Sequence, residues 1–362
     1  MATAARRPDL ADLDRPALES ALTALGHQPF HARQIFQWIY RRGVADVAAM
    51  TDLSRDLRAT LAQHFTLATP ALVHRDTSSD GTEKFLLRLA DGRQIESVFI
   101  PDTPSMTFCI STQVGCAMAC AFCLTGKMGL VRNLSAGEIV GQVRVLADAL
   151  HMRDVTFNIV LMGMGEPLHN YDETMKALRI LTDQDGFAMS PRRITLSTVG
   201  LLSALERLAN EPVMPNLAIS LHAPTDLLRG ELVPINRKHG VADIIAACRR
   251  FPVRRRSRIT FEYVLLAGVN DSPDDARHLA KLVASVRSKV NLIPLNAAPG
   301  IPFERPTDAA IDRFAKTLAD RGIVVSVRKS RGRDIRAACG QLIVEGQKKS
   351  AAQQLATLAF GP

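Results

Sequence analysis

The apolar residues of the first 70 positions are spaced as they are in helices. From Ala17 to Leu25 and from Ala32 to Arg42, apolar side chains recur every three or four positions, which places them on one face of an α-helix. Gly26 and Gly43 follow these two segments, and glycine is a common residue just beyond a helix end. The pattern therefore predicts a small helical domain over residues 1–70.

The pattern changes over residues 71–104. Thr82–Ala90 and Gln94–Ile100 are rich in strand-forming residues and lie on either side of Asp91-Gly92. An Asp-Gly pair between two such runs favours a tight β-hairpin turn. We expect this segment to form a β-hairpin extension that links the helical domain to the rest of the chain.

From about residue 105 onward, short apolar strands alternate with helical patterns. Ser135 and Glu138 form a capping box at the start of one of these helices. The strands are expected at Thr107–Thr112, Thr156–Met162, Arg193–Ser197, Asn216–Ser220, Arg258–Leu265, Lys289–Ile293 and Ile323–Val327. Repeated strand–helix units build a parallel sheet, and six or seven of them suit an open barrel. The predicted fold class is therefore α/β, a partial (β/α)6-type barrel over residues 105–345, with 346–362 as a C-terminal tail.

Composition and charge narrow the class of protein. The chain has 362 residues, of which 47% are hydrophobic, enough for a sizeable core. Its net charge of +9 suits a polyanionic partner such as nucleic acid, whereas an aromatic content of 5% disfavours extended base-stacking platforms. We expect no membrane segment, because no stretch reaches about 18 uninterrupted apolar residues. The N-terminus lacks the apolar run of a secretory signal, and six cysteines are too few for a disulfide scaffold, so we expect a cytoplasmic protein.

Three cysteines fall within eight residues, directly after the first predicted barrel strand. Cys116, Cys120 and Cys123 form a C-x3-C-x2-C arrangement. Three thiolates can hold three irons of a 4Fe-4S cluster, which leaves the fourth iron free to bind the amine and carboxylate of S-adenosylmethionine. A structural zinc site is the alternative, but it needs four ligands, usually in two separated pairs. The spacing is the signature of the radical S-adenosylmethionine superfamily, and Phe122 matches the aromatic residue that usually stands there.

Polar residues at the ends of four predicted strands indicate a cofactor pocket. Glycines in Gly163-Met-Gly165-Glu166 let the backbone approach a ligand, and the carboxylate can pair with the ammonium group of the methionine moiety. Each of the other polar residues could instead cap a helix or turn, and a histidine here is as often structural as a ligand. Together, however, they would surround one mouth of the barrel. The predicted cofactor-binding residues are Gly165, Glu166, Ser197, Ser220, Leu221, His222 and Asn296.

A further cysteine, Cys339, lies beyond the last predicted strand in the sequence Ala-Cys-Gly-Gln-Leu. It is preceded by the basic residues Arg328, Lys329, Arg331, Arg333 and Arg336. Nearby cations lower the pKa of a thiol and favour the nucleophilic thiolate. The alternative is a buried, inert cysteine. The flanking glycine and charges favour a loop, and therefore a reactive thiol.

These motifs together resemble the RlmN family of dual-specificity RNA methyltransferases. The matching segments cover nearly the whole chain in the family's order: Gln34–Tyr40, IESVFIP, CxxxCxxC, GMGEPL, SPRRITLST, SLHAP, VNLIPLN and ACGQL. One departure is Leu124, which follows the third cysteine where family members often carry a small residue. The resemblance implies that the helical domain docks RNA.

The resemblance also implies a mechanism in which Cys339 takes a methyl group from one S-adenosylmethionine. A second S-adenosylmethionine, cleaved at the cluster, would give a radical that removes hydrogen from the methylated Cys339. The resulting methylene radical would add to carbon 2 of adenine, which is too electron-poor for a simple electrophile; covalent catalysis makes this route feasible. Cys109 would release the product through a transient disulfide with Cys339, and Glu96 in IESVFIP matches the family's proton acceptor. Without the resemblance, Glu96 would be interpreted as an ordinary strand carboxylate.

The partners that the resemblance implies are 23S ribosomal RNA and tRNA, each modified at one adenosine. The dense basic run Arg249–Arg258 either contacts phosphates or is an ordinary solvated surface. We also expect a flavodoxin- or ferredoxin-type reductant and a monomeric enzyme. Two alternatives are a related resistance-type methyltransferase that modifies carbon 8 of adenine, and a zinc-stabilised RNA-binding protein without catalysis. The Glu-Pro-Leu after Gly165 and the IPLN stretch favour the carbon-2 enzyme.

Overall fold

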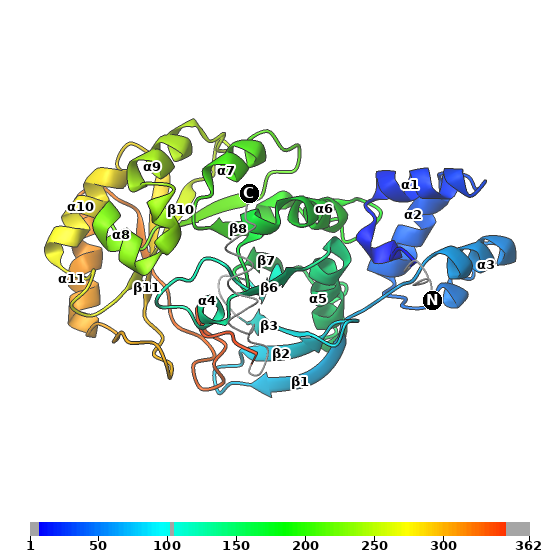
Figure 1. Cartoon of the computed structure of the whole chain (residues 1–362), viewed down its shortest axis with the longest axis horizontal. Helices are drawn as coiled ribbons and strands as arrows, with labels where there is room; N and C mark the ends of the chain where they lie inside the picture. Colours follow the sequence, from blue (N-terminus) through cyan, green and yellow to red (C-terminus); the bar gives the residue numbers. More distant parts are fainter. Residues whose placement is uncertain (1–6, 102–104, 345–362) are drawn as a thin grey trace, which may run out of the picture.

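The core of the protein is a curved sheet of parallel strands, seen in a computed structural model that describes residues 7–101 and 105–344 (Figure 1). These strands are β4 (Thr107–Cys109), β7 (Asn158–Leu161), β8 (Ile194–Thr198), β9 (Asn216–Ser220), β10 (Ile259–Leu265), β11 (Ser288–Pro294) and β12 (Val325–Val327). They pair side by side in this order, each parallel to its neighbour. The predicted α/β fold with a partial barrel is therefore confirmed.

Helices on the outer surface connect the parallel strands (Figure 1). They are α5 (Ala136–Ala149), α6 (Tyr171–Thr182), α7 (Leu202–Leu208), α8 (Asp226–Leu232), α9 (Val241–Arg250), α10 (Pro273–Val283) and α11 (Asp308–Ala319). A short, mostly buried helix, α4 (Leu124–Met128), directly follows the clustered cysteines. Helix α5 begins at the predicted capping box, in which the Ser135 and Glu138 side chains each accept a hydrogen bond from the other's backbone N–H. Its apolar side, which includes Ile139, Val143 and Leu146, is fully buried.

An antiparallel extension adds three strands to the β4 edge of the sheet. These are β1 (Ala71–Thr77), β2 (Glu83–Arg88) and β3 (Gln94–Ile100). The predicted hairpin turn at Asp91-Gly92 joins β2 to β3, and Gly92 has a φ of +83°, which glycine adopts without strain. A separate two-stranded sheet, β5 (Gln113–Gly115) with β6 (Leu130–Asn133), flanks the segment that carries the clustered cysteines.

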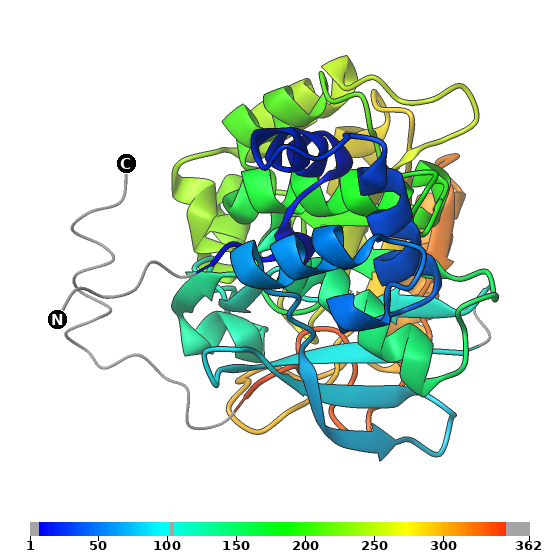
Figure 2. The same cartoon turned by 90° about the vertical axis from the view of Figure 1, so that its right-hand side faces the viewer.

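The N-terminal domain is helical and packs beside α5 and α6, as Figure 2 shows with the blue helices facing the viewer. Its elements are η1 (Leu10–Asp12), α1 (Arg15–Ala24), α2 (His31–Phe36), the π-helical turn η2 (Gln37–Arg41), η3 (Val47–Ala49) and α3 (Arg55–His64). Ion pairs attach it to the end of α6 and the loop that follows, with Arg179 Nε 2.8 Å from Asp14 Oδ2 and Arg15 Nε 2.8 Å from Asp183 Oδ2.

The domain boundaries at residues 70, 104 and 345 remain predictions. The expected C-terminal tail, residues 346–362, lies outside the described residues. Within residues 7–101 and 105–344, no helix has both the length and the apolar character needed to cross a bilayer.

Candidate active site

A cavity of about 140 Å³ opens at the carboxyl ends of the parallel strands. Most of the predicted site residues line it: Cys116, Cys120, Cys123, Gly165, Glu166, Ser197, Ser220, His222, Asn296 and Cys339. The structure therefore brings together segments that are up to 223 positions apart, from Cys116 to Cys339. The lining does not include Leu221, Cys109 or Glu96.

Backbone hydrogen bonds hold the cysteine loop in place. The N–H of Cys116 donates to the carbonyl of Gly129 (3.1 Å), and the N–H of Leu124 donates to the carbonyl of Gly340 (2.8 Å). The second bond ties the loop directly to the residue after Cys339. Burial raises the pKa of all three thiols, to about 12 for Cys116. Thiolates at these positions therefore require a bound metal to offset the cost of burying their charge.

The three clustered thiols fit an iron–sulfur cluster, because in a cubane each thiolate binds a different iron, whereas a structural zinc site needs four ligands on one ion. The cavity also contains a buried amide oxygen, Asn296 Oδ1, that has no hydrogen-bond partner within the described chain. An unpaired buried acceptor is costly, so it suits a ligand that donates a hydrogen bond.

Glu166 lies in the loop that follows β7, directly after Gly165, whose backbone conformation requires glycine. A Cβ at Gly165, where φ is +104°, would lie 2.7 Å from the Cβ of Gln113. The two Glu166 carboxylate oxygens accept hydrogen bonds from the N–H groups of Leu168 and Val199, both at 3.0 Å. Burial raises the pKa of Glu166 to about 7 in spite of these bonds. A cationic ligand such as an α-ammonium group would favour its ionised form.

Ser197 and Ser220 belong to a polar cluster with a further carboxylate, Glu262, and of the three only Ser220 is not buried. The two hydroxyl oxygens are 3.2 Å apart, and Ser197 Oγ donates to Glu262 Oε2 on β10 at 3.3 Å. Glu262 also lines the cavity. Two hydroxyls and a carboxylate on three adjacent strands can hydrogen-bond a vicinal diol such as that of a ribose.

His222 and Leu221 are fixed by backbone contacts. The Nδ1 atom of His222 accepts a hydrogen bond from the N–H of Val264 (3.1 Å), and its ring packs edge-on against Phe122. Burial lowers the pKa of His222 to about 3, so the ring is neutral at physiological pH. Leu221 is fully buried and contributes its carbonyl, which accepts from the guanidinium of Arg229 (3.0 Å).

The side chain of Arg229 forms hydrogen bonds with the backbone at the ends of β8 and β9. It is fully buried, and its guanidinium donates to the carbonyls of Val199, Ser220 and Leu221 as well as to Asn236 Oδ1. Burial lowers the pKa of Arg229 to about 10. These bonds satisfy the carbonyls at the ends of β8 and β9 and fix the turn that carries His222.

Cys339 and Cys109 line the same narrow hollow beside the main cavity, together with Arg328. We expected the surroundings of Cys339 to lower its pKa, but the balance is the reverse: burial raises it, and the charge of Arg328 opposes that effect only in part. Burial also raises the pKa of Cys109, to about 12. Both thiols are free in the structure.

Glu96 lies on β3, close to the segment that follows Cys339. Its Oε2 accepts from the N–H of Ile343 (2.8 Å), and its Oε1 pairs with Lys84 Nζ at 3.1 Å. The side chain is almost fully buried, and burial raises its pKa despite the charge of Lys84. A carboxylate with a raised pKa is a stronger base than an ordinary one and is therefore better suited to accept a proton.

The basic run 249–258 lies at the opposite end of the barrel from the cavity. It precedes β10, so it is at the amino end of that strand, where it borders the beginnings of β9 and β10. Arg328, Lys329, Arg331 and Arg333 instead follow β12, at the carboxyl end of that strand, and Arg328 and Arg331 line the hollow beside the cavity. This second set is therefore better placed for RNA that enters the site.

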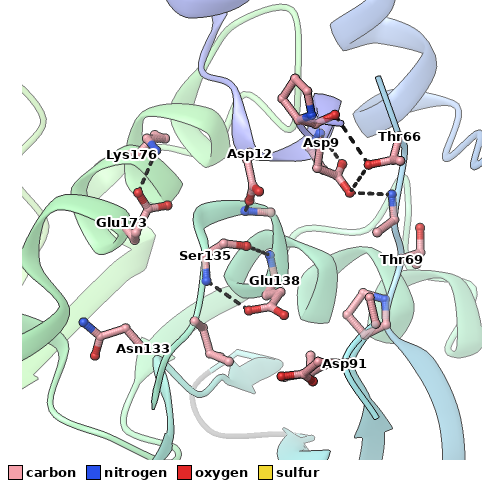
Figure 3. Close-up of a pocket in the computed structure, with 18 of the residues that line it drawn as sticks. Asp9, Asp12, Thr66, Thr69, Asp91, Asn133, Ser135, Glu138, Glu173 and Lys176 are labelled. Carbon is pink, nitrogen blue, oxygen red and sulfur yellow. Dashed lines mark hydrogen bonds and ion pairs between the residues drawn. The ribbon is translucent and has the colours of Figure 1, made fainter. Parts of the chain in front are cut away.

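A separate, larger hollow lies between the N-terminal domain and α5 (Figure 3). Its acidic groups serve the protein's own backbone: Asp12 Oδ1 accepts from the N–H of Gly137 and Glu173 Oε2 from the N–H of Ala136, both at 2.8 Å. Asp9 Oδ2 similarly accepts from the N–H of Ala68 and the hydroxyl of Thr66. This hollow is a docking seam between the two domains.

Sequence reasoning did not identify Glu262 or Arg229 as part of the site. The sequence does contain a feature that points to Glu262, because it is a charged residue inside the apolar strand Ile259–Leu265. No sequence feature points to Arg229, because its partners are mostly backbone carbonyls that only the fold brings within reach.

Comparisons with known proteins agree with this geometry. Residues 8–67 match the family described as "Ribosomal RNA large subunit methyltransferase N-terminal domain", and residues 110–282 match the radical SAM superfamily. The chain is similar to the "Dual-specificity RNA methyltransferase RlmN" of Anaeromyxobacter dehalogenans, with 46% identity over 366 residues and 98% of each chain covered. The protein of that name from Geobacter sulfurreducens is 49% identical over 334 residues, covering 92% of this chain and 91% of the relative.

A solved structure is also similar over almost its full length. It is the crystal structure of a radical SAM methyltransferase from Sphaerobacter thermophilus, with 49% sequence identity and a TM-score of 0.87. The match covers 92% of this chain and 99% of that chain. The similarity therefore extends over the helical domain, the hairpin extension and the barrel.

Proposed function

The chain belongs to the RlmN family of dual-specificity RNA methyltransferases, and from that premise we propose that it methylates carbon 2 of adenine in 23S ribosomal RNA and in the tRNA anticodon loop. The observation that carries the proposal is the cavity in which Cys339 lies beside three clustered cysteines and the strand-end residues around Glu166. A methyl-carrying thiol must be able to reach both the cofactor and the base, and this cavity offers that position.

The cofactors are a 4Fe-4S cluster held by Cys116, Cys120 and Cys123, and S-adenosylmethionine. When bound, the cluster supplies the electron that cleaves the sulfonium and so yields the radical that takes a hydrogen atom from the methyl group on Cys339. Glu166 is positioned for the ammonium group of S-adenosylmethionine, and Ser197 and Ser220 for its ribose. Asn296 offers its unpaired oxygen to a donor on the ligand.

Cys339 acts first as a nucleophile: its sulfur takes the methyl group of one S-adenosylmethionine, a carbon–sulfur bond forms, and S-adenosylhomocysteine leaves. The guanidinium of Arg328 supports the thiolate that this step requires. After the methylene carbon has joined the base, the adduct must lose one electron, which the cluster would accept when bound, and Glu96 accepts the proton from carbon 2. Cys109 then attacks Cys339 Sγ, a disulfide forms, the sulfur–methylene bond breaks, and the electron pair moves to the methylene carbon, which is protonated to a methyl group.

The proposal is tested by reconstituting the enzyme anaerobically and supplying RNA with S-adenosylmethionine that carries a CD3 group. Because one deuterium is removed while the methyl group is on Cys339, the product should be 2-methyladenosine with two deuteriums, and 5′-deoxyadenosine should accumulate with the third. The product is identified by mass spectrometry against 2- and 8-methyladenosine standards. Three retained deuteriums would contradict the proposed route, and 8-methyladenosine would favour the carbon-8 alternative.

The proposed partners are the two RNA substrates and a flavodoxin- or ferredoxin-type protein that reduces the cluster. RNA binding is supported by the basic residues on the cavity side, since phosphate contacts provide affinity that does not depend on sequence. We propose a monomeric enzyme in the cytoplasm, where both RNA substrates occur. Separate assays with each RNA test whether both are modified.

A further inference from the structure

The turn between β1 and β2 lies against the loop that carries Cys339, although no sequence motif connects the two. In Figure 1 the red C-terminal segment runs beside the cyan strands of the extension, and Figure 2 shows the same arrangement from the side. Ser78 Oγ donates to Asp334 Oδ1 (2.5 Å), and the N–H of Ser79 donates to Asp334 Oδ2 (3.1 Å). In the other direction, the N–H of Gly332 donates to Asp80 Oδ2 (3.0 Å).

The loop is closed on itself at the same place. The N–H of Ala337, two residues before Cys339, donates to the carbonyl of Gly332 (2.8 Å). Gly332 is buried with a φ of +62°, and a Cβ there would lie 2.7 Å from Ala337 Cβ and 2.9 Å from Thr82 Cγ2. The approach between turn and loop is therefore so close that it requires glycine.

All the carboxylate oxygens of the two aspartates accept hydrogen bonds, within the turn or across this contact. The second oxygen of Asp80, Oδ1, accepts from the N–H of Thr82 (3.0 Å), so each of the four carboxylate oxygens has a donor from the chain. Burial alone would raise the pKa of Asp80, but hydrogen bonds from Thr82, Gly332 and Ser78 outweigh it and hold the pKa at about 2. Both carboxylates are thus ionised at physiological pH, and neither lines the cavity or the hollow beside it.

The other side of Cys339 has its own anchors. The Thr125 hydroxyl donates to the carbonyl of Leu342 (2.6 Å), and the N–H of Ile343 donates to Glu96. With the bond from Leu124 to Gly340, these contacts tie the segment after Cys339 to the cysteine loop and to β3. The segment before Cys339 is tied to the β1–β2 turn.

We propose that Ser78–Thr82, with Asp334 and Gly332 opposite, forms a latch that positions Cys339, and that Asp80 and Asp334 are positioning residues for methyl transfer. The inference rests on the proposed methyl-carrying role of Cys339. The Cys339 thiol must contact the cofactor, the base and Cys109 in turn. Its loop must therefore stay attached both before and after Cys339, while only the few residues between the two attachments move. Opening the latch leaves the cluster site intact but lets Cys339 drift from the cofactor.

The test uses the full-length, reconstituted enzyme with the variants Asp80→Asn, Asp334→Asn and their combination. An amide offers one acceptor where the carboxylate offers two, so each change removes one hydrogen bond and weakens the other. Removing a hydrogen bond to a charged group corresponds to roughly tenfold or more in a local opening equilibrium. Asp91→Asn is the matched control, because Asp91 accepts from a backbone N–H in the other turn of the same extension, away from Cys339.

Two measurements report on the latch. Hydrogen–deuterium exchange should become at least about tenfold faster for the amides of residues 331–337 in the double variant and stay unchanged in the control. Methyl groups placed on RNA per 5′-deoxyadenosine formed should fall by about tenfold or more, while iron content and 5′-deoxyadenosine formation persist. Gly332→Ala, which forces turn and loop apart by a different route, should give the same loss of coupling.

The two measurements distinguish a contact that positions Cys339 from one that is only structural or that does not hold the loop. Unchanged exchange in the double variant shows that the contact does not hold the loop, and it overturns the latch. Faster exchange with full coupling shows that the contact is structural only, and it overturns the positioning role. Failure of the proposed function is distinguishable, because the unmodified enzyme would then carry no S-methyl group on Cys339 while the exchange measurement would still report on the latch.

Discussion

The thiol of Cys339 must ionise to act as a nucleophile, but its buried surroundings disfavour the thiolate. Burial raises its pKa, and of the surrounding groups Arg328 opposes that shift most. Cys109 lies in the same hollow without the compensation it would need to ionise at neutral pH. Both thiols are therefore weaker acids than a free cysteine, and Arg328 opposes the shift at each. Cys109 gains a use only when a sulfur to attack has been formed beside it.

Replacing Cys109 should stop the reaction after the base has been bound. In Cys109→Ala no second thiol is available to break the sulfur–methylene bond, so RNA should remain covalently attached to Cys339. The adduct is detected as a protein band that shifts on nuclease digestion, and mass spectrometry locates it on the peptide that contains residue 339. Cys248→Ala is the control, because Cys248 is buried in α9, outside the site. A Cys109→Ala enzyme that is RNA-free and fully active would exclude the resolving role.

Product release should slow at acidic pH, because it depends on the ionised form of Glu96. Burial raises its pKa above the ordinary value of 4.5, and only the ionised form can accept a proton from carbon 2. The rate of the final step should therefore rise as the pH passes upward through a value above 4.5 and then level off. Single-turnover assays of enzyme already methylated on Cys339 measure this step.

Glu96→Gln should abolish that pH dependence and leave the adduct unresolved. Glu83→Gln on the neighbouring strand β2 is the control, since Glu83 pairs with Arg75 and does not line the site. If the Glu96→Gln variant has the rate of the unmodified enzyme and the same decrease in rate at acidic pH, another group accepts the proton.

At the scale of elements, hydrophobic patterning was sufficient for the barrel strands because most of their residues are apolar and buried, although β12 is largely exposed. Strand β1 escaped prediction because almost all of its residues are exposed and polar residues follow one another without alternation. The pair β5–β6 escaped because each strand is short and stabilised by the cysteine loop between them. Likewise, motif spacing identified the cluster and Cys339, but the latch depends on Asp80 and Asp334, whose 254-residue separation leaves no pattern to recognise.

The hydrogen bond between Asp12 and the first turn of α5 should help to hold the N-terminal domain against the barrel. Asp12 from the N-terminal domain caps this helix by accepting from the N–H of Gly137. Removing such a cap in Asp12→Ala should reduce the free energy of unfolding by about 1 kcal/mol. It should also speed hydrogen exchange along the seam of Figure 3. Chemical denaturation and exchange measure the two effects.

Asp46→Ala is the matched control for docking, because Asp46 caps η3 within the N-terminal domain. That variant should lose similar stability but leave exchange at the start of α5 unchanged. Equal exchange at this seam in both variants would show that Asp12 has no part in holding the domains together.

At the scale of the whole molecule, two basic regions lie at opposite ends of the barrel. The run that includes Arg255 and Arg256 is the denser one in the sequence, but it precedes β10 and so lies at the amino ends of the strands. Lys329 and Arg333 follow β12, at the carboxyl end of that strand, and both are exposed. Because an adenine must enter at the carboxyl ends, the shorter and less conspicuous set is expected to contact the RNA backbone.

Neutralising each pair in turn separates their roles. In Lys329→Gln/Arg333→Gln, up to two RNA phosphates are left without a cationic partner, which should weaken RNA binding at low salt. The slope of log affinity against log salt should become shallower by roughly 0.7–0.9 for each such phosphate. In Arg255→Gln/Arg256→Gln, which removes the same charge, affinity and slope should stay close to those of the unmodified enzyme. Fluorescence anisotropy with a labelled anticodon stem-loop over a salt series measures both quantities. If the second pair gives the larger change, RNA wraps around the amino end of the barrel, and the assignment of the docking surface reverses.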